Sequence, residues 1–173
     1  LDFSIGQYDT YTPIQLSQYI GTIANGGYRI EPHLLKAVYD SKGKELSNLL
    51  TTVQPKVLNK VNTKDEYLER VKEGFKQVML PGGTGYNTMP LDIKPAGKTG
   101  TSQSFIDSDS NGYVDKETIT TTFVGYAPYD NPVVTFTVIS PDVSHRDNKS
   151  SYQTRVNNRI TYQVSKKFFQ IYK

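Results

Sequence analysis

The spacing of apolar positions along the chain predicts three helices. Apolar residues recur at helical intervals in three separate segments. These segments cover residues 13–24, 63–80 and about 152–172. The first helix is expected to begin with a capping box of Thr12 and Gln15, and the second with a capping box of Thr63 and Glu66. The last helix carries a long apolar stripe, which requires the face of a sheet to cover it.

A small peripheral hairpin is predicted between the first two helices. The chain is extended and partly apolar over residues 28–39, and the turn-forming run 40–43 leads into a short second strand near 44–46. Residues 47–62 show no clear period. We therefore expect them to form a surface connection.

The second half of the chain has the pattern of strands. They are predicted near 93–104, 119–127 and 133–140, and the turn-forming run 128–132 joins the last two. Such short connections make strands antiparallel neighbours. The glycine-rich run 81–85 separates the strands from the second helix. The sequence therefore predicts an α+β fold with an antiparallel sheet flanked by helices.

The composition of the chain excludes several classes of function. The 20 basic and 17 acidic residues give a net charge of +3 and form no long run of like charge, so nucleic-acid binding is not expected. Cysteine is absent, which excludes disulfides, zinc–thiolate sites and a cysteine nucleophile. No apolar run is long enough for a membrane span. Because the sequence begins with Leu1 rather than Met, we expect it to be a piece of a larger protein.

The most informative stretch is Gly97-Lys98-Thr99-Gly100-Thr101. Glycine weakens a strand interior, so two glycines beside Lys-Thr indicate a close approach of a ligand or of another backbone. Lys98 offers a compact positive charge, and the hydroxyls of Thr99 and Thr101 are two positions apart, hence on one face of a strand. A carboxylate would fit there. The alternative is a glycine-bounded strand start with a solvated lysine.

The surroundings of this stretch resemble the transpeptidase domain of class B penicillin-binding proteins. Lys-Thr-Gly is the third signature of the penicillin-recognising serine acyltransferases, to which these proteins belong. Five further segments match in the same order and with similar spacing. They are Ile5-Gly6-Gln7, Thr12-Pro13-Ile14-Gln15-Leu16, Ala24-Asn25-Gly26-Gly27, Gly83-Thr84-Gly85 and Phe123-Val124-Gly125-Tyr126-Ala127-Pro128. The resemblance covers nearly the whole chain.

The resemblance implies a five-stranded antiparallel sheet in which Lys-Thr-Gly lies on an edge strand beside the active site. This chain would be an incomplete, C-terminal portion of that domain, without the first two strands and the nucleophilic serine. By similarity, Lys98 would supply positive potential beside the nucleophile, and the hydroxyls of Thr99 and Thr101 would hold the terminal carboxylate of the substrate. The backbone N–H of Thr101 would form half of the oxyanion hole, and Gly100 would leave room for the substrate backbone.

The implied activity is D,D-transpeptidation, in which peptidoglycan stem peptides are cross-linked through a serine acyl-enzyme that β-lactams also form. The chain alone would be inactive. It would act with an upstream part that carries S-x-x-K and S-x-N, on the extracytoplasmic face of the bacterial cell membrane and without a cofactor. Two other functions stay open. One is a D,D-carboxypeptidase or β-lactamase of the same superfamily, and the other is a non-catalytic β-lactam-binding sensor or scaffold domain.

Two further motifs are weaker candidates. The run Ser41-Lys42-Gly43-Lys44 has formal S-x-x-K spacing, but its glycine and turn setting are wrong for a catalytic helix. Asp107, Asp109, Asn111 and Asp115 have the spacing of a calcium loop, which here lacks the final glutamate. A polar hairpin loop with Asx-turns is expected instead.

The two histidines are not expected to act as a catalytic base or to bind a metal. His33 and His145 have no carboxylate or second histidine at ligand spacing. The run Ser144-His145-Arg146-Asp147 contains the three residue types of a catalytic triad side by side, but a triad is formed by spatial geometry and not by sequence adjacency.

Overall fold

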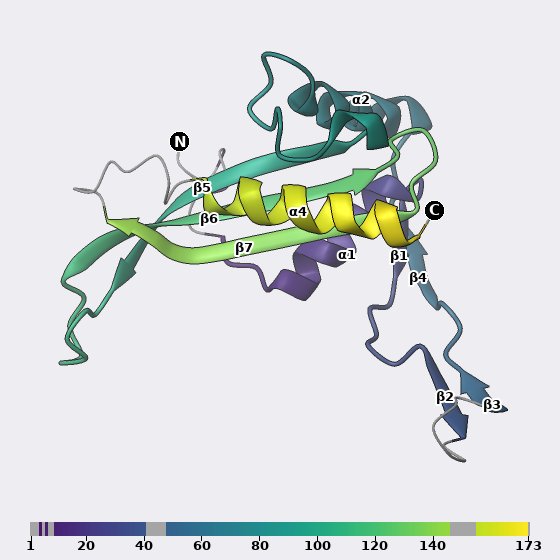
Figure 1. Ribbon diagram of the computed structural model, residues 1–173, viewed down its shortest axis with the longest axis horizontal. Helices are drawn as coiled ribbons and strands as arrows, with labels where there is room; N and C mark the ends of the chain where they lie inside the picture. The colour runs from purple at the N-terminus through teal and green to yellow at the C-terminus, as the bar shows by residue number, and fades with distance from the viewer. Residues whose placement is uncertain (1–3, 5, 7–8, 41–47, 146–154, 173) are drawn as a thin grey trace.

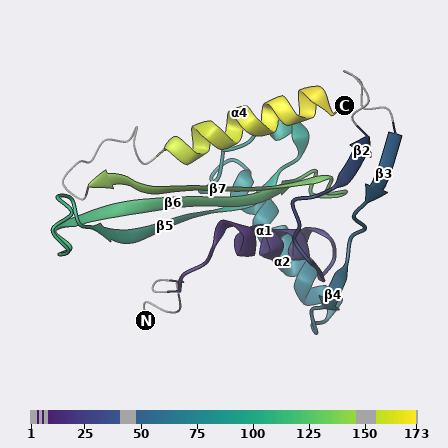
Figure 2. The same cartoon turned by 90° about the horizontal axis from the view of Figure 1, so that it is seen from below.

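The computed structural model describes residues 4, 6, 9–40, 48–145 and 155–172. Its elements follow the chain as α1 (Pro13–Ala24), β1 (Tyr28–Ile30), β2 (Ala37–Asp40), β3 (Asn48–Thr52), β4 (Val57–Lys60), α2 (Asp65–Met79), η2 (Leu91–Ile93), β5 (Ala96–Ile106), β6 (Lys116–Ala127), β7 (Val134–His145) and α4 (Val156–Ile171). The helix α4 lies along one face of the sheet of β5, β6 and β7, and α1 lies on the opposite face (Figures 1 and 2).

The main sheet is antiparallel, with the strand order β5-β6-β7. The pairing of β5 with β6 is uninterrupted from Ala96 to Ile106. The pairing of β6 with β7 shifts register between Ile119 and Thr121. Within the described chain, β5 and β7 are therefore the two edge strands.

The three strands predicted in the second half of the chain are present, but with different bounds. The first begins at Ala96 and not near 93, because Leu91–Ile93 form the 3-10 helix η2 and Lys94 then takes a left-handed conformation with φ of 51°. The other two are longer than predicted and reach Lys116 and His145. The extra residues are mostly polar and have no apolar pattern, so the sequence does not mark them.

The first and last helices agree with their predictions. The capping box of α1 is confirmed: Thr12 Oγ1 accepts a hydrogen bond from the Gln15 N–H, and Gln15 Oε1 accepts one from the Thr12 N–H. The helix α4 lies within the predicted range, of which residues 152–154 fall outside the described chain. No described helix has both the length and the apolar character needed to cross a membrane.

The capping box predicted for the second helix is wrong. The N-cap of α2 is Lys64 and not Thr63, and no side chain caps the helix at this end. Asp65 and Glu66 lie in the first turn, where negative charge is favoured by the helix dipole. The helix begins with favourable charge in place of a side-chain cap.

The region between α1 and α2 contains more strand than predicted. The hairpin in this region differs from the predicted one: the extended segment 28–39 is divided into β1 and β2, and β2 pairs with β3. The second strand predicted near 44–46 lies in the undescribed residues 41–47. The expectation that residues 47–62 form only a connection is wrong, because β3 and β4 lie there and β4 pairs with β1. Every residue of β3 and β4 is exposed. Such strands have no alternating pattern of buried side chains for the sequence to reveal.

Two apolar clusters hold the start of β5 between the helices. The cluster on the α1 face contains Ile20, Ile23, Ala24, Ala96, Val124 and Tyr126. The cluster on the α4 face contains Met79, Met89, Phe123, Ala127 and Phe136, with Phe168 and Phe169 packed against it. A Cβ atom at Gly97 would lie 2.6 Å from Cζ of Phe123, so this position has room only for glycine. The strand is therefore fixed by close packing immediately before Lys98.

The core residue Tyr126 is fully buried on β6, and its hydroxyl has no hydrogen-bond partner among the described residues. Burial, aided by the negative charge of Glu69, raises the pKa of Tyr126 to about 12. A tyrosine in the unfolded chain has a pKa of about 10. The raised pKa therefore stabilises the folded protein at pH values below about 10, the pKa of tyrosine in the unfolded chain. This stabilisation is lost as the pH rises through about 12, the pKa of Tyr126 in the folded protein.

The Tyr126→Phe variant is expected to be more stable than the unsubstituted protein at neutral pH. Removing an unpaired buried hydroxyl should raise the free energy of unfolding by about 1 kcal/mol. The variant should also lose less stability between neutral and strongly alkaline pH. Denaturant unfolding of both proteins at pH 7 and near pH 11 measures the two effects. An unchanged dependence on alkaline pH would contradict the assignment to Tyr126.

Candidate functional site

The Lys-Thr-Gly stretch lies near the start of the edge strand β5. Lys98, Gly100 and Thr101 are exposed, and Thr99 is half-buried. Lys98 Nζ donates a hydrogen bond to the carbonyl oxygen of Thr99, with a distance of 2.6 Å. Because side chains alternate along the strand, Thr99 and Thr101 lie on one face and Lys98 and Gly100 on the other. The strand thus brings two hydroxyls and one ammonium group to the same open edge.

Hydrogen bonding along β5 shows which backbone groups face this open edge. The carbonyl oxygen of Ile106 accepts a hydrogen bond from the N–H of Asp115, across the hairpin to β6. Successive residues of a strand direct their backbone groups to opposite edges, and the pairing from Ala96 to Ile106 is regular. Even-numbered positions of β5 therefore bond to β6. The N–H and C=O groups of Thr99 and Thr101 point to the edge that carries no strand in the described chain.

The Gly83-Thr84-Gly85 segment lies beside this strand. Thr99 Oγ1 donates a hydrogen bond to Thr84 Oγ1, with a distance of 3.2 Å. A Cβ atom at Gly83 would overlap the carbonyl oxygen of Val78, so the segment must pack closely against the end of α2. The segment belongs to the family resemblance of the sequence, but the sequence alone assigns no role to Thr84. A threonine between glycines in a matching segment is the signal that could have identified it.

An open groove of about 730 Å³ runs along β5 from Gly100 to Phe105. The segment before α1, including Asp9 and Tyr11, forms its other side. A Cβ atom at Gly100 would lie 3.6 Å from Cβ of Thr122, which is an ordinary contact. The fold therefore accepts a side chain at position 100, and that side chain would occupy space at the groove.

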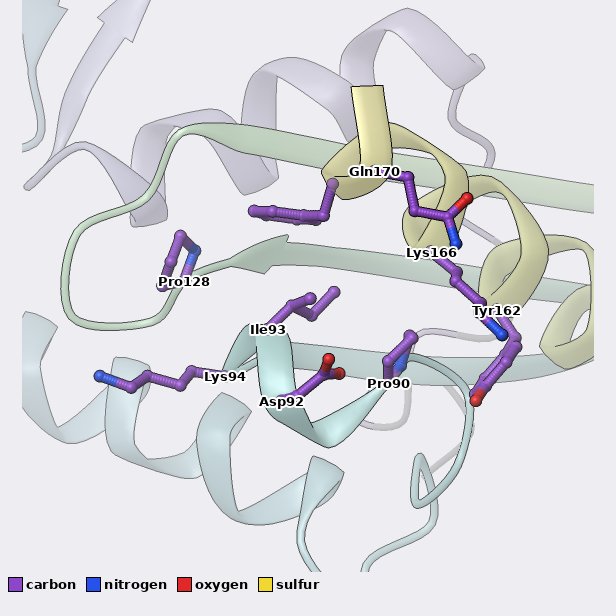
Figure 3. A pocket seen from close by; sticks show the side chains of 9 residues that line it. Pro90, Asp92, Ile93, Lys94, Pro128, Tyr162, Lys166 and Gln170 are labelled. Carbon is purple, nitrogen blue, oxygen red and sulfur yellow. The ribbon is translucent and has the colours of Figure 1, made fainter. Parts of the chain in front are cut away.

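A second cavity of about 670 Å³ lies on the α4 face of the protein. Figure 3 shows Tyr162, Lys166 and Gln170 of α4 on one side of it and the segment around η2 on the other. Lys94, at the rim, is paired with Asp130 at 2.8 Å. None of the four residues from Lys98 to Thr101 lines this cavity. The groove along β5 is therefore the candidate site.

The acidic loop between β5 and β6 is held by its own backbone. Asp107 accepts hydrogen bonds from the N–H groups of Gly112 and Asn111, at 2.6 and 3.1 Å. The Gly112 N–H is the main cause that lowers the pKa of Asp107, and the Ser108 hydroxyl is the main cause that lowers that of Asp115. The Asx-turn hairpin expected from the sequence is confirmed. Within the described residues, no group of three or more acidic or histidine side chains could hold a metal ion.

Calcium is not expected to stabilise this loop, because backbone N–H and hydroxyl groups already occupy the carboxylates of Asp107 and Asp115. A cation that binds only the folded state raises the melting temperature by mass action. Millimolar calcium should therefore shift the melting temperature no more than millimolar magnesium does. A calcium-specific rise that disappears in the Asp107→Asn variant would show that the loop is a cation site.

Among the remaining candidates from the sequence, His33 does not line the groove along β5. His33 Nδ1 lies 2.7 Å from the carbonyl oxygen of Leu35 in an exposed segment, and His145 is the last residue of β7. The run 41–44 lies outside the described residues, as do Arg146 and Asp147. The chemistry that the structure describes is therefore that of β5 and the residues around it.

Comparison with known proteins identifies the family to which this chain belongs. The family model described as the penicillin binding protein transpeptidase domain matches residues 1–166. The chain belongs to this family. The predicted α+β fold, an antiparallel sheet flanked by helices, is confirmed by structures of penicillin-binding proteins.

This transpeptidase-family chain is similar to several longer proteins. It is 44% identical to penicillin-binding protein 2A of Bacillus subtilis, over 99% of this chain and 24% of that protein. It is 33% identical to the peptidoglycan D,D-transpeptidase MrdA of Haemophilus influenzae, over 80% of this chain and 22% of that protein. The structure of penicillin-binding protein 2B of Streptococcus pneumoniae matches 94% of this chain with a TM-score of 0.70 and 32% identity, over 26% of that chain. The present chain spans about a quarter of the length of these relatives.

Proposed function

We propose that this chain supplies the substrate-binding strand of a D,D-transpeptidase that cross-links peptidoglycan stem peptides through a serine acyl-enzyme. The observation that carries the proposal is the open edge of β5, where the backbone of Thr99 and Thr101 faces outward beside the groove. A peptide can add to such an edge as an extra strand. A relative named as a peptidoglycan D,D-transpeptidase supports the choice of reaction.

Each residue of the site has a chemical role in this proposal. The ammonium group of Lys98 provides positive potential beside the nucleophile and the substrate carboxylate. The hydroxyls of Thr99 and Thr101 donate hydrogen bonds to that carboxylate. A hydroxyl has one donor and two lone pairs, so Thr99 can turn its O–H from Thr84 to the ligand and still accept a hydrogen bond from Thr84. Gly100 leaves the space in which the substrate backbone lies.

The first step forms the acyl-enzyme. The serine Oγ attacks the carbonyl carbon of the D-alanyl-D-alanine bond, its proton passes to a neighbouring base, and the carbonyl π electrons move to the oxygen. The N–H of Thr101 donates a hydrogen bond to this oxyanion. When the tetrahedral intermediate collapses, the C–N bond breaks, and D-alanine leaves after its nitrogen takes up the proton. In the second step the amine of a neighbouring stem peptide attacks the carbonyl carbon of the ester and gives up a proton to the base. The C–Oγ bond then breaks, the new amide bond is complete, and the base returns the proton to the serine oxygen.

The nucleophile in this proposal lies on an upstream part of the same protein, together with the S-x-x-K and S-x-N signatures. A serine that acylates must lie within bonding reach of a carbonyl group held at Thr101, and the groove beside Gly100 gives a segment access to that position. Two further surfaces suit contact with such a part. They are the second edge of β7 and the exposed side chains of Ile160 and Val164 on α4. We place the complete domain on the extracytoplasmic face of the bacterial cell membrane.

The experiment that tests this function uses the complete protein that carries the chain. The protein is first treated with a fluorescent penicillin and the adduct is located by mass spectrometry. It is then incubated with a stem-peptide donor and an acceptor amine, and the products are identified. We expect an adduct on a serine upstream of residue 1 and a cross-linked peptide product. An adduct on Ser41 would refute the assignment, and a hydrolysed donor without a cross-linked product would indicate a carboxypeptidase.

A further inference from the structure

The amide of Asn157 joins the first turn of α4 to the backbone of two strands. The residue is 2% exposed, and its Nδ2 donates hydrogen bonds to the carbonyl oxygens of Thr121 on β6 and Val138 on β7, at 2.6 and 3.1 Å. The hydroxyl of Ser140 on β7 donates to Asn157 Oδ1. These three hydrogen bonds join β6, β7 and α4 at one position along the strands, which we call the Asn157 level.

Thr101 of β5 also lies at the Asn157 level, because cross-strand pairing places it there. Thr121 is the cross-strand partner of Thr101 on β6, and it is also the partner of Ser140 on β7. The ladder between β6 and β7 shifts register between Ile119 and Thr121, next to the position that Asn157 holds. A register shift disrupts the regular ladder locally. The hydrogen bonds from Asn157 therefore fix the β6 backbone where the ladder alone is weakest.

The backbone of Thr101 has no hydrogen bond of its own to β6, because its N–H and C=O face the open edge. Its two neighbours, Gly100 and Ser102, bond to β6 and set the depth of Thr101 in the groove. On β6 they pair with Thr122 and Thr120. These two residues of β6 flank Thr121. A movement of β6 at Thr121 therefore moves the Thr101 N–H by a similar amount.

We infer that Asn157 is a positioning residue for the oxyanion hole. Asn157 holds β6 at Thr121 and so sets the position of the Thr101 N–H. The inference rests on the proposed function, and it adds a buried residue of α4 that lies away from the open edge of β5. Oxyanion stabilisation depends on a donor held at hydrogen-bond distance from the developing charge. The role of Asn157 is to keep that donor from shifting as the charge forms.

The test compares variants in the complete protein by rapid-mixing kinetics with a fluorescent penicillin. These kinetics separate the dissociation constant of the non-covalent complex from the rate constant of acylation. The Asn157→Ala variant is expected to acylate about tenfold more slowly with a nearly unchanged dissociation constant, since displacement of a catalytic group by a fraction of an ångström costs this much. Asn157→Asp, which keeps the shape and loses the donor, should behave in the same way.

The matched control is Ser165→Ala. Ser165 is also fully buried on α4, but its hydroxyl donates only to the Tyr162 carbonyl oxygen within the helix, at 3.2 Å. At a temperature well below both melting points, this control should acylate at the unsubstituted rate even where its loss of melting temperature equals that of Asn157→Ala. Ser140→Ala provides a milder change in the Asn157 cluster if both Asn157 variants fail to fold, and it should slow acylation about threefold.

Three outcomes would overturn the role of Asn157. These are an equal fall in the acylation rate constant in Asn157→Ala and Ser165→Ala, an unchanged rate constant in the variants of the Asn157 cluster that fold, and a change confined to the dissociation constant. Failure of the unsubstituted protein to acylate is a different result. It would overturn the proposed function itself.

Discussion

The Gly100→Val variant of the complete protein is expected to lose acylation by a penicillin almost entirely while remaining folded. Gly100 is exposed at the groove, and a Cβ atom there would make only an ordinary contact with Thr122, at 3.6 Å. Branched side chains also suit strands. The valine would therefore be accepted by the sheet and would occupy the space assigned to the substrate. We expect a fall of at least about a hundredfold in the acylation rate, the size of effect that follows a misplacement of about 1 Å.

The same substitution at a neighbouring glycine provides the control. A Cβ atom at Gly97 would lie 2.6 Å from the ring of Phe123 and 2.9 Å from the carbonyl oxygen of Val124, so Gly97→Val should lower the melting temperature strongly. Gly100→Val should change the melting temperature little. The acylation rate and the melting temperature of both variants are measured together. If Gly100→Val acylates at the unsubstituted rate, no ligand lies on this part of β5.

The Lys98→Met variant is expected to acylate about a hundredfold to a thousandfold more slowly, as when a group that stabilises developing charge is removed. Lys98 is exposed, and its described hydrogen bond is to the carbonyl oxygen of Thr99, the next residue. Methionine keeps the length and the apolar stem of the side chain. The variant should therefore lose the charge at the site without losing the fold.

Two other lysine variants sharpen this prediction. Lys98→Arg keeps the charge but spreads it over a planar guanidinium group, so we expect an intermediate loss of about tenfold. Lys116→Met removes an exposed lysine at the far end of β6 and should leave acylation unchanged. The acylation rate constant and the melting temperature of each variant are the measured quantities. Equal rates for Lys98→Met and Lys116→Met would remove Lys98 from the mechanism.

The parts of the fold that the sequence predicts are those with a local physical cause. The helix α1 follows from the side-chain chemistry of Thr12, Pro13 and Gln15, which fix its start within one turn. The strands β6 and β7 follow from their apolar residues and the short turn between them. The strands β3 and β4, which the sequence did not predict, are exposed at every residue. They form by pairing of backbone groups, so the sequence contains no alternation of apolar and polar side chains that would indicate them.

The sequence indicates which residues form the candidate site, but it does not indicate how they are arranged in space. The sequence indicates that the hydroxyls of Thr99 and Thr101 share a face, because that depends only on the alternation of a strand. The direction of the Thr101 N–H depends on its register with β6. The contact of Thr99 with Thr84 and the bonds from Asn157 to the sheet join residues far apart in the chain. Such tertiary contacts follow from the folded structure alone.

The most direct measurement is a crystal structure of the complete protein acylated by a penicillin. The central claim is that the open edge of β5 holds the acyl group. It predicts that the acyl carbonyl oxygen lies about 2.7–3.1 Å from the backbone nitrogen of Thr101. It also predicts that the ligand carboxylate contacts the hydroxyls of Thr99 and Thr101, with Gly100 beside the ligand. An acyl group whose oxygen is bound away from Thr101, with β5 free of ligand, would contradict the account.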